Sequence, residues 1–132
     1  SRAGDKTTVE ELWANSLMRI HFSNAIRVGD FVYGSSGDFG PAPFTAVNVK
    51  TGNVAWRNRS FPRASFLFAD GRFIILDEDG HLLLATATSD GLSVTSKAEL
   101  LQNQSWTVPS LSGSRLYLRD RKNIVAVELG PQ

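Results

Sequence analysis

Hydrophobic residues along this chain gather in short runs of five to eight residues, separated by Gly, Asp, Asn and Ser. Runs of this length between turn-forming residues predict β-strands. No segment keeps a helical period over twelve residues. The pattern predicts eleven strands, at 24–28, 30–36, 43–49, 53–59, 64–69, 72–77, 81–88, 92–98, 107–111, 114–120 and 123–129.

Segment 8–14 carries Val9, Leu12 and Trp13. Its Thr-x-x-Glu beginning resembles a helix capping box. So short an apolar run also fits a strand, however, and the all-β context favours that interpretation. We expect an N-terminal strand here.

The predicted strands repeat with a fixed period. Gly29, Gly71 and Gly113 each precede an apolar strand and lie 42 residues apart. The same spacing aligns Val32, Ile74 and Leu116, and also Tyr33, Ile75 and Tyr117. A β-sandwich would give many short strands but not this period, whereas four strands in roughly 42 residues are typical of a β-propeller blade.

We therefore predict an all-β fold of about three β-propeller blades, each a four-stranded antiparallel meander. The whole chain, 1–132, is one partial propeller domain. Its repeats cover 21–62, 63–104 and 105–132, and the N-terminal strand 8–14 stands outside them.

Residues 45–56, TAVNVKTGNVAW, contain the clearest motif. The residues Ala46, Asn48, Thr51, Gly52 and Trp56 resemble the tryptophan-docking motif of the PQQ-like (quinoprotein-type) β-propeller repeats, Ala-x-Asp-x-x-Thr-Gly-x-x-x-Trp. Asn48 replaces the Asp of the family pattern and keeps an acceptor oxygen. The resemblance implies that the tryptophan packs against a neighbouring blade while the Thr-Gly turn sets the hairpin.

Two further segments resemble the motif in part. A second copy aligns Ala85 with Ala46 and Thr95 with Trp56, so it has lost its tryptophan. Glu11-Leu12-Trp13 is predicted to be the outer strand of a blade whose other strands do not precede it. Trp13 and Trp56 are therefore the expected inter-blade docking residues.

The resembling family contains both enzymes and non-enzymatic proteins. Its dehydrogenases hold pyrroloquinoline quinone (PQQ) with Ca²⁺ or a lanthanide, and many carry a vicinal cysteine pair. This chain has no cysteine, and no Glu-Asn-Asp set matches calcium ligands. We therefore expect no quinone cofactor. The non-enzymatic members include an outer-membrane assembly scaffold and many secreted or periplasmic proteins, which implies a periplasmic or secreted location. No signal peptide is seen in this chain.

Three blades do not close a propeller, for which four to eight are typical. Either the remaining blades of a longer chain or a second copy must complete the ring. Two copies would give about six blades, so we expect a homodimer in which strands are exchanged.

Composition narrows the class of partner. The net charge of +1 offers no electrostatic footprint for nucleic acid. The apolar runs are too short for a transmembrane helix, so we expect no membrane insertion. The absence of cysteine excludes disulfides and thiolate catalysis.

Two sets of residues are candidates for a site. His21, Arg63 and Ser105 share one column of the 42-residue repeat, at the start of the innermost strands. Different polar residues around a channel mouth could bind a protein or a small polar ligand. A divalent metal site is the alternative, with ligands drawn from His21, His81, Asp38, Asp77 and Asp79. Residues 77–80, Asp-Glu-Asp-Gly, favour a hairpin turn over a calcium loop because the later bidentate Glu is missing.

The sequence thus favours a non-catalytic scaffold or binding module. One alternative is a metal-dependent hydrolase with a site around His21 and His81. A second alternative is a fragment of a quinoprotein dehydrogenase.

Overall fold

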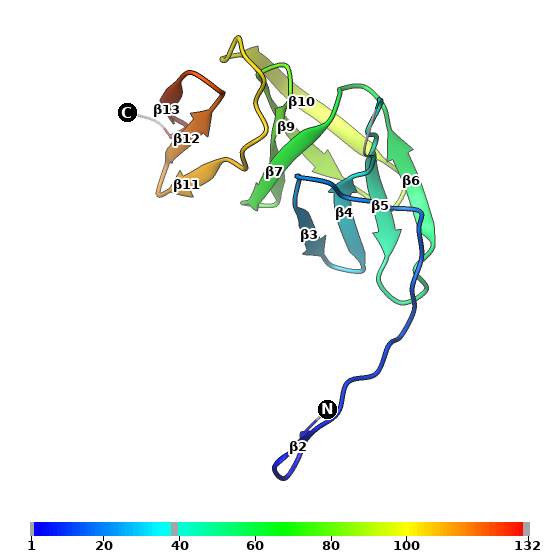
Figure 1. Cartoon of the computed structure of the whole chain (residues 1–132). Helices are drawn as coiled ribbons and strands as arrows, with labels where there is room; N and C mark the ends of the chain where they lie inside the picture. Colours follow the sequence, from blue (N-terminus) through cyan, green and yellow to red (C-terminus); the bar gives the residue numbers. More distant parts are fainter. Residues whose placement is uncertain (1, 38–39, 131–132) are drawn as a thin grey trace.

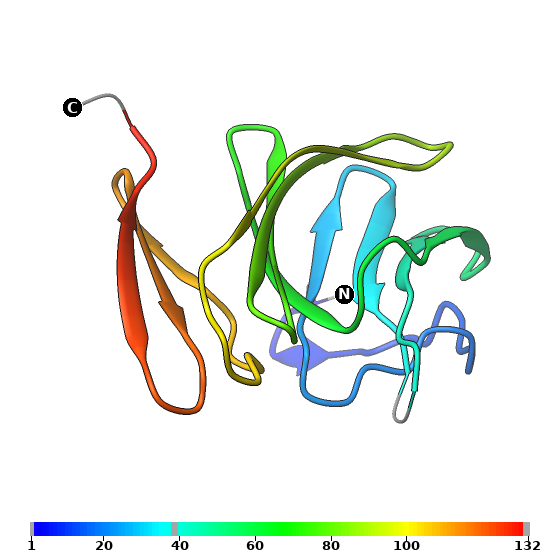
Figure 2. The ribbon, with the colours of Figure 1, turned by 90° about the horizontal axis from the view of Figure 1, so that it is seen from above.

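The computed structural model describes residues 2–37 and 40–130, and all of its regular structure is β. Three antiparallel sheets follow one another in chain order along an arc (Figures 1 and 2). No helix that could cross a membrane occurs in the described chain.

The strands of each sheet pair in chain order, as in a meander. The first sheet has four strands: β3 (Ala25–Val28), β4 (Phe31–Ser35), β5 (Phe44–Asn48) and β6 (Val54–Asn58). The second also has four: β7 (Ala64–Ala69), β8 (Arg72–Asp77), β9 (His81–Ala87) and β10 (Leu92–Glu99). The third has three: β11 (Ser110–Ser112), β12 (Arg115–Arg119) and β13 (Ile124–Glu128). A separate hairpin of β1 (Arg2–Ala3) and β2 (Lys6–Thr7) precedes them.

Each of the eleven strands predicted from residue 24 onward overlaps one of β3–β13, so their existence and order are confirmed, although β11 (Ser110–Ser112) begins three residues later than predicted and the hairpin of β1 and β2 was not predicted. The predicted strand at 8–14 is wrong, because no strand is assigned between β2 and β3. The physical reason is that a strand needs a neighbour for its backbone N–H and C=O groups. No sheet of the described chain offers one to this segment.

The strand register corrects the alignment of the second repeat by one residue. Phe31, Arg72 and Arg115 begin the second strand of their sheets, at spacings of 41 and 43 residues. The turn before β8 places both Asp70 and Gly71 at positive φ, +48° and +72°. Asp70 therefore takes the place of Gly29 and Gly113, and Ile74 is the counterpart of Tyr33 and Tyr117.

The core lies between neighbouring sheets, and β8 shows why its sequence is apolar without alternation. Phe73 and Ile75 belong to the cluster packed against the first sheet, whereas Ile74 and Leu76 belong to the cluster packed against the third. Successive strand residues point to opposite faces. The run Phe-Ile-Ile-Leu therefore serves two interfaces, as expected for a strand covered on both faces.

Candidate functional site

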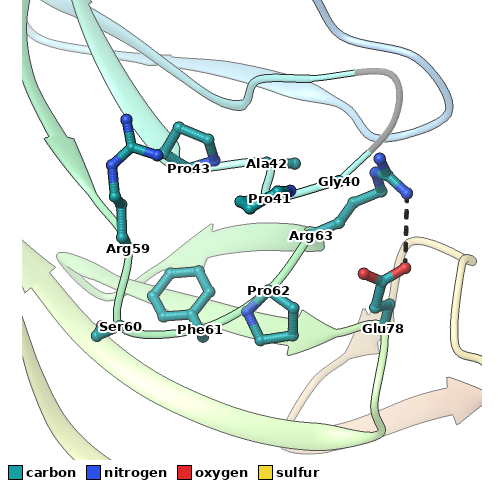
Figure 3. A pocket seen from close by; sticks show the side chains of 10 residues that line it. All are labelled: Gly40, Pro41, Ala42, Pro43, Arg59, Ser60, Phe61, Pro62, Arg63 and Glu78. Atoms are coloured by element: carbon teal, nitrogen blue, oxygen red, sulfur yellow. Dashed lines mark ion pairs between the residues drawn. The ribbon is translucent and has the colours of Figure 1, made fainter.

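Arg63 and Glu78 form an ion pair where the first and second sheets meet, with Arg63 Nη1 3.6 Å from Glu78 Oε2. The pair borders a hollow of about 510 Å³, shown in Figure 3. Pro41, Pro43 and Phe61 line the hollow, and Arg59 lies at its other side. The side chain of Arg63 is buried, and its guanidinium contacts the Glu78 carboxylate and the Phe22 ring.

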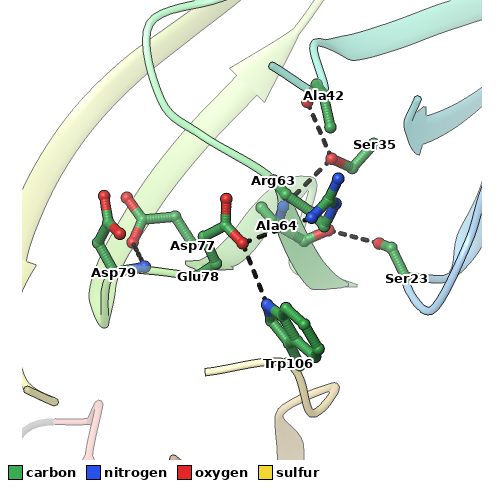
Figure 4. A network of polar contacts seen from close by, with 9 residues as sticks. All are labelled: Ser23, Ser35, Ala42, Arg63, Ala64, Asp77, Glu78, Asp79 and Trp106. Atoms are coloured by element: carbon green, nitrogen blue, oxygen red, sulfur yellow. Dashed lines mark hydrogen bonds and ion pairs between the residues drawn. The ribbon is translucent and has the colours of Figure 1, made fainter. Parts of the chain in front are cut away.

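Trp106, just before the third sheet, connects this pair to the first sheet. Its Nε1 donates a hydrogen bond to Glu78 Oε2 at 3.1 Å (Figure 4). Its ring stacks on Phe22, with centroids 4.2 Å apart and planes at 28°. The Arg63 guanidinium lies 5.0 Å from the Phe22 centroid, and the Arg121 guanidinium lies 5.4 Å from that of Trp106. Side chains from the loops of all three sheets thus meet here.

Three polar side chains of the first sheet form hydrogen bonds to the backbone of β7. Ser23 and Asn24 come just before β3, and Ser35 is the last residue of β4. Asn24 receives a hydrogen bond from Phe66 N at 3.1 Å and donates one to Phe66 O at 2.8 Å. Ser35 Oγ accepts from Ala64 N at 3.1 Å, and Ser23 Oγ donates to Ala64 O (Figure 4). These bonds satisfy β7 on the side where a sheet edge would otherwise be open.

The predicted channel-mouth residues do not share one environment. Arg63 and Ser105 are buried beside Glu78, whose backbone oxygen accepts a hydrogen bond from Ser105 N at 3.0 Å. His21 is exposed, and its ring lies against that of Phe22. Glu78 and Phe22, which join the sheets, were not predicted as site residues from the sequence. The alignment of Phe22 with Trp106 in one column of the repeat was the available signal.

Two of the candidate metal ligands, Asp77 and His81, contact each other in the β8–β9 turn. Asp77 is fully buried, and its Oδ1 accepts hydrogen bonds from Asp79 N at 3.1 Å and His81 N at 2.9 Å. His81 Nδ1 lies 3.0 Å from Asp77 Oδ2. The carboxylate therefore caps a hairpin turn. Asp38 lies outside the described residues.

Among residues 2–37 and 40–130, no three His, Asp or Glu side chains come close enough to hold a metal ion. The same donor set does not fit the calcium ion that accompanies PQQ, which binds through several carboxylate or amide oxygens. No step of chemistry through a metal or a quinone follows from these residues.

Asp120 caps the corresponding turn of the third sheet. Burial opposes its ionisation, but hydrogen bonds from Asn103, Lys122 and Asn123 outweigh burial and hold the pKa of the carboxyl well below its usual range. The shortest of these hydrogen bonds runs from Asn123 N to Asp120 Oδ1, at 2.6 Å. Like Asp77, this carboxylate organises a turn.

The tryptophan motif mediates contact between neighbouring sheets. Trp56 Nε1 donates to Thr88 O, in the β9–β10 turn, at 3.0 Å. Trp13 makes the same kind of bond one sheet earlier, from its Nε1 to Val49 O at 2.7 Å in the β5–β6 turn. The Trp13 ring covers Gly52 so closely that a Cβ there would lie 2.8 Å from it.

Asn48 supplies the turn contacts expected of the family's Asp. Its Oδ1 accepts hydrogen bonds from Lys50 N at 2.9 Å and from Thr51 N at 3.2 Å. Thr51 Oγ1 accepts from Asn53 N at 3.2 Å. The side-chain oxygen at position 48 thus fixes the turn on which Trp13 lies.

The second sheet has no indole at the equivalent place. Ala46 pairs with Trp56, and the counterpart pair in the second sheet is Leu84 with Ser96. The alignments of Ala85 with Ala46 and of Thr95 with Trp56 are therefore each wrong by one residue. Thr95 is the bulged residue between Val94 and Ser96. A hollow of about 590 Å³, lined by Ile74, Leu84, Leu111 and Leu129 among others, remains between the second and third sheets.

Ser96→Trp is expected to stabilise the protein by about 1–2 kcal/mol, because the indole would bury apolar surface in that hollow. Urea unfolding followed by far-UV circular dichroism measures the change. Ser93→Trp, on the same exposed strand, is the control and should be neutral. A destabilised Ser96→Trp variant would show that the hollow is not an indole site.

No family model and no curated protein matches the chain. Eighteen chains of solved structures do match. One is the crystal structure of BamB from Moraxella catarrhalis, with 22% identity and a TM-score of 0.59 over 77% of this chain. At this identity the likeness concerns the fold, and together with three successive antiparallel meanders it decides the architecture. The chain is a partial β-propeller. Its first two sheets are complete blades, the third is a blade of three strands, and the chain spans 29% of the BamB chain.

Proposed function

We propose that this partial propeller is a non-catalytic scaffold that holds polypeptide partners. The observation that carries the proposal is the use of its inner polar groups. Arg63, Glu78 and Trp106 join blades to one another, and Asp77 with His81 caps a turn. Among the described residues these groups make contacts within the protein that hold the blades and the turn in place, so we assign them a structural role.

The scaffold would act as part of a larger ring. A propeller needs four to eight blades, and this chain supplies two complete blades and part of a third. The ring is completed either by a second copy, giving about six blades, or by further blades of a longer chain. A partner protein or a small polar ligand would then bind on the loop face.

A periplasmic or secreted location is part of this proposal. The resemblance of residues 45–56 to the PQQ-like repeats supports it. Fractionation of cells that express the natural gene is the direct measurement. Recovery of the protein in the cytoplasmic fraction would contradict the location without affecting the scaffold role.

The scaffold role and the hydrolase alternative predict different metal contents. We expect elemental analysis of the purified protein to find no stoichiometric metal, and incubation with PQQ to leave no quinone bound. His81→Ala should lower stability because it removes a partner of the buried Asp77 carboxylate. His21→Ala should not, since His21 is exposed.

Stoichiometric metal that is lost in both histidine variants, together with hydrolysis of an ester or phosphoester that is lost with it, would overturn the scaffold proposal.

A further inference from the structure

A second hollow, of about 580 Å³, adjoins the hollow shown in Figure 3. The two share Pro41, Pro43 and Arg59 in their walls, so they lie side by side with these residues between them. The other walls of the second hollow include four residues from the segment before the first blade and from β6: Ser16, Leu17, Arg19 and Arg57. We call the second hollow the arginine hollow and the one in Figure 3 the proline hollow.

Two of the arginines stand on a well-fixed backbone at the end of β6. Arg57 lies on β6, and its Nη2 donates a hydrogen bond to Leu17 O at 3.1 Å. Arg59 follows β6 directly. The turn at Arg59 is held by Asn58, whose Oδ1 accepts hydrogen bonds from Ser60 N at 2.9 Å and from Ser60 Oγ at 2.6 Å. Both side chains are exposed and reach the arginine hollow from this one strand end.

The described walls of the arginine hollow carry positive charge and no carboxylate. Arg19, Arg57 and Arg59 line it, whereas no Asp or Glu does so among the described residues. The partner of Arg57 is a neutral carbonyl oxygen, and neither Arg57 nor Arg59 forms an ion pair with any described residue. A guanidinium group presents paired N–H donors that match the two oxygens of a carboxylate. The arginine hollow is therefore complementary to an acidic group.

The proline hollow offers a different chemistry beside it. Pro41, Pro43, Phe61 and Pro62 line it, so most of its wall is apolar (Figure 3). The wall is also preformed, because proline rings fix φ and Pro43 O accepts a hydrogen bond from Ser36 N at 2.9 Å. A hollow of this size and lining suits an apolar side chain, above all an aromatic one.

The neighbourhood of a cationic and an apolar hollow selects the class of partner. In an extended polypeptide, side chains two residues apart project to the same side, so an acidic and an apolar side chain can enter the two hollows together. A nucleic acid needs a row of cations for its phosphates. Here the Glu78 carboxylate borders the proline hollow, and the net charge of the chain is only +1. A single inorganic anion would leave most of the arginine hollow empty.

We propose that the two hollows bind an extended acidic segment of a partner protein. An Asp or Glu side chain of that segment pairs with Arg57 and Arg59, and an apolar side chain two residues away lies between Pro43 and Phe61. This inference rests on the proposed function, since it names the chemistry of the polypeptide that the scaffold would hold.

Capped synthetic peptides test the proposal by NMR titration of the isotope-labelled chain. The probe is Gly-Phe-Glu-Asp-Glu-Phe-Gly, in which a Phe stands two positions from the Asp in either direction. We expect a dissociation constant on the order of 100 μM, with the largest amide shifts at Arg57, Arg59 and Phe61. Replacing the acids of the probe by Gln and Asn, or its Phe residues by Ser, should each weaken binding at least about fivefold.

Arg57→Gln combined with Arg59→Gln should weaken binding of the acidic probe at least about tenfold. The sheets should stay folded by circular dichroism, because both side chains are exposed. In this variant the acidic and amide peptides should bind equally, while the loss from Phe to Ser should remain. The matched control is Arg27→Gln combined with Arg72→Gln, two exposed arginines beside the β3–β4 and β7–β8 turns. It removes the same charge and should change the affinity less than about twofold.

Equal binding of the acidic and amide peptides to the unaltered chain, or an equal loss in the control variant, would overturn the proposal. Tighter binding of a single-stranded oligothymidylate than of the probe would also overturn it, as would binding of capped aspartate alone as tightly as the probe. A metal-free protein that binds no peptide would overturn the acidic-segment site and leave the scaffold proposal in place. Peptide binding by a protein with stoichiometric metal and hydrolytic activity would overturn the scaffold and keep the site.

Discussion

Gly80→Ala is expected to destabilise the protein by more than about 3 kcal/mol. Gly80 lies in the β8–β9 turn at φ +92°, and a Cβ there would be 2.2 Å from Leu101 O and 2.6 Å from Leu101 C. Those atoms are backbone, so no side-chain rotation relieves the clash. Gly80 O also accepts hydrogen bonds from Leu100 N and Leu101 N, at 3.1 Å each. The substitution would separate the second blade from the chain that leads to the third.

Gly113→Ala is the control that distinguishes the steric clash from the cost of a left-handed backbone conformation. Gly113 has φ +60° and nothing within 4 Å of a Cβ position. Its replacement should cost only the left-handed strain, about 1–2 kcal/mol. Urea unfolding of both variants gives the comparison. Equal losses for the two variants would mean that the Leu100–Leu101 segment moves freely and does not fix the third blade.

Phe44→Ala is expected to cost about 3–5 kcal/mol, through lost burial and the cavity left behind. Phe44 is fully buried, and its ring lies 4.9 Å from that of Phe66 and 5.6 Å from that of Phe73 on the second blade. Trp56 and Phe61 pack on the same ring. One side chain thus joins the two complete blades, so its loss should broaden the unfolding transition as well as shift it.

Phe68→Ala is the matched control, since Phe68 lies on β7 and is partly exposed, although its ring is 4.9 Å from that of Phe73. Its loss should cost well under half as much as that of Phe44. If thermal unfolding showed equal losses, Phe44 would not be the main contact between the first two blades.

Strand positions were predictable because the signals are local. Alternating or continuous apolar runs end at Gly and Asx-Gly turns, and a glycine at positive φ marks the hairpin. The motif at 46–56 also predicted its contact, because an indole at a blade edge needs a neighbouring surface. The one-residue shift at Asp70-Gly71 was not predictable in this way. Both residues of this turn have positive φ, so Asp70 takes the first turn position, which Gly29 and Gly113 hold in the other blades, and the glycine stands one position later.

The inner face was predicted less well. The repeat alignment selected His21, Arg63 and Ser105 by position, but burial and partners depend on what the neighbouring blades bring. Arg63 forms an ion pair with Glu78, and Trp106 bonds to Glu78 and stacks on Phe22. These residues come from segments far apart in the chain. No local sequence pattern predicts contacts between side chains that are so far apart in the chain.

The sequence by itself determined the strands, their turns and the meander order, because these depend on hydrophobic pattern and backbone preference within a few residues. Only the tertiary structure decided which segments pair as strands and which apolar faces are covered. Segment 8–14 has the composition of a strand, yet the described chain forms no strand there, while Tyr117 and Ile124 are exposed where Tyr33 and Phe44 are covered by the second blade. A strand and a buried face both require a neighbour, and which neighbours a chain brings together is a property of the whole fold.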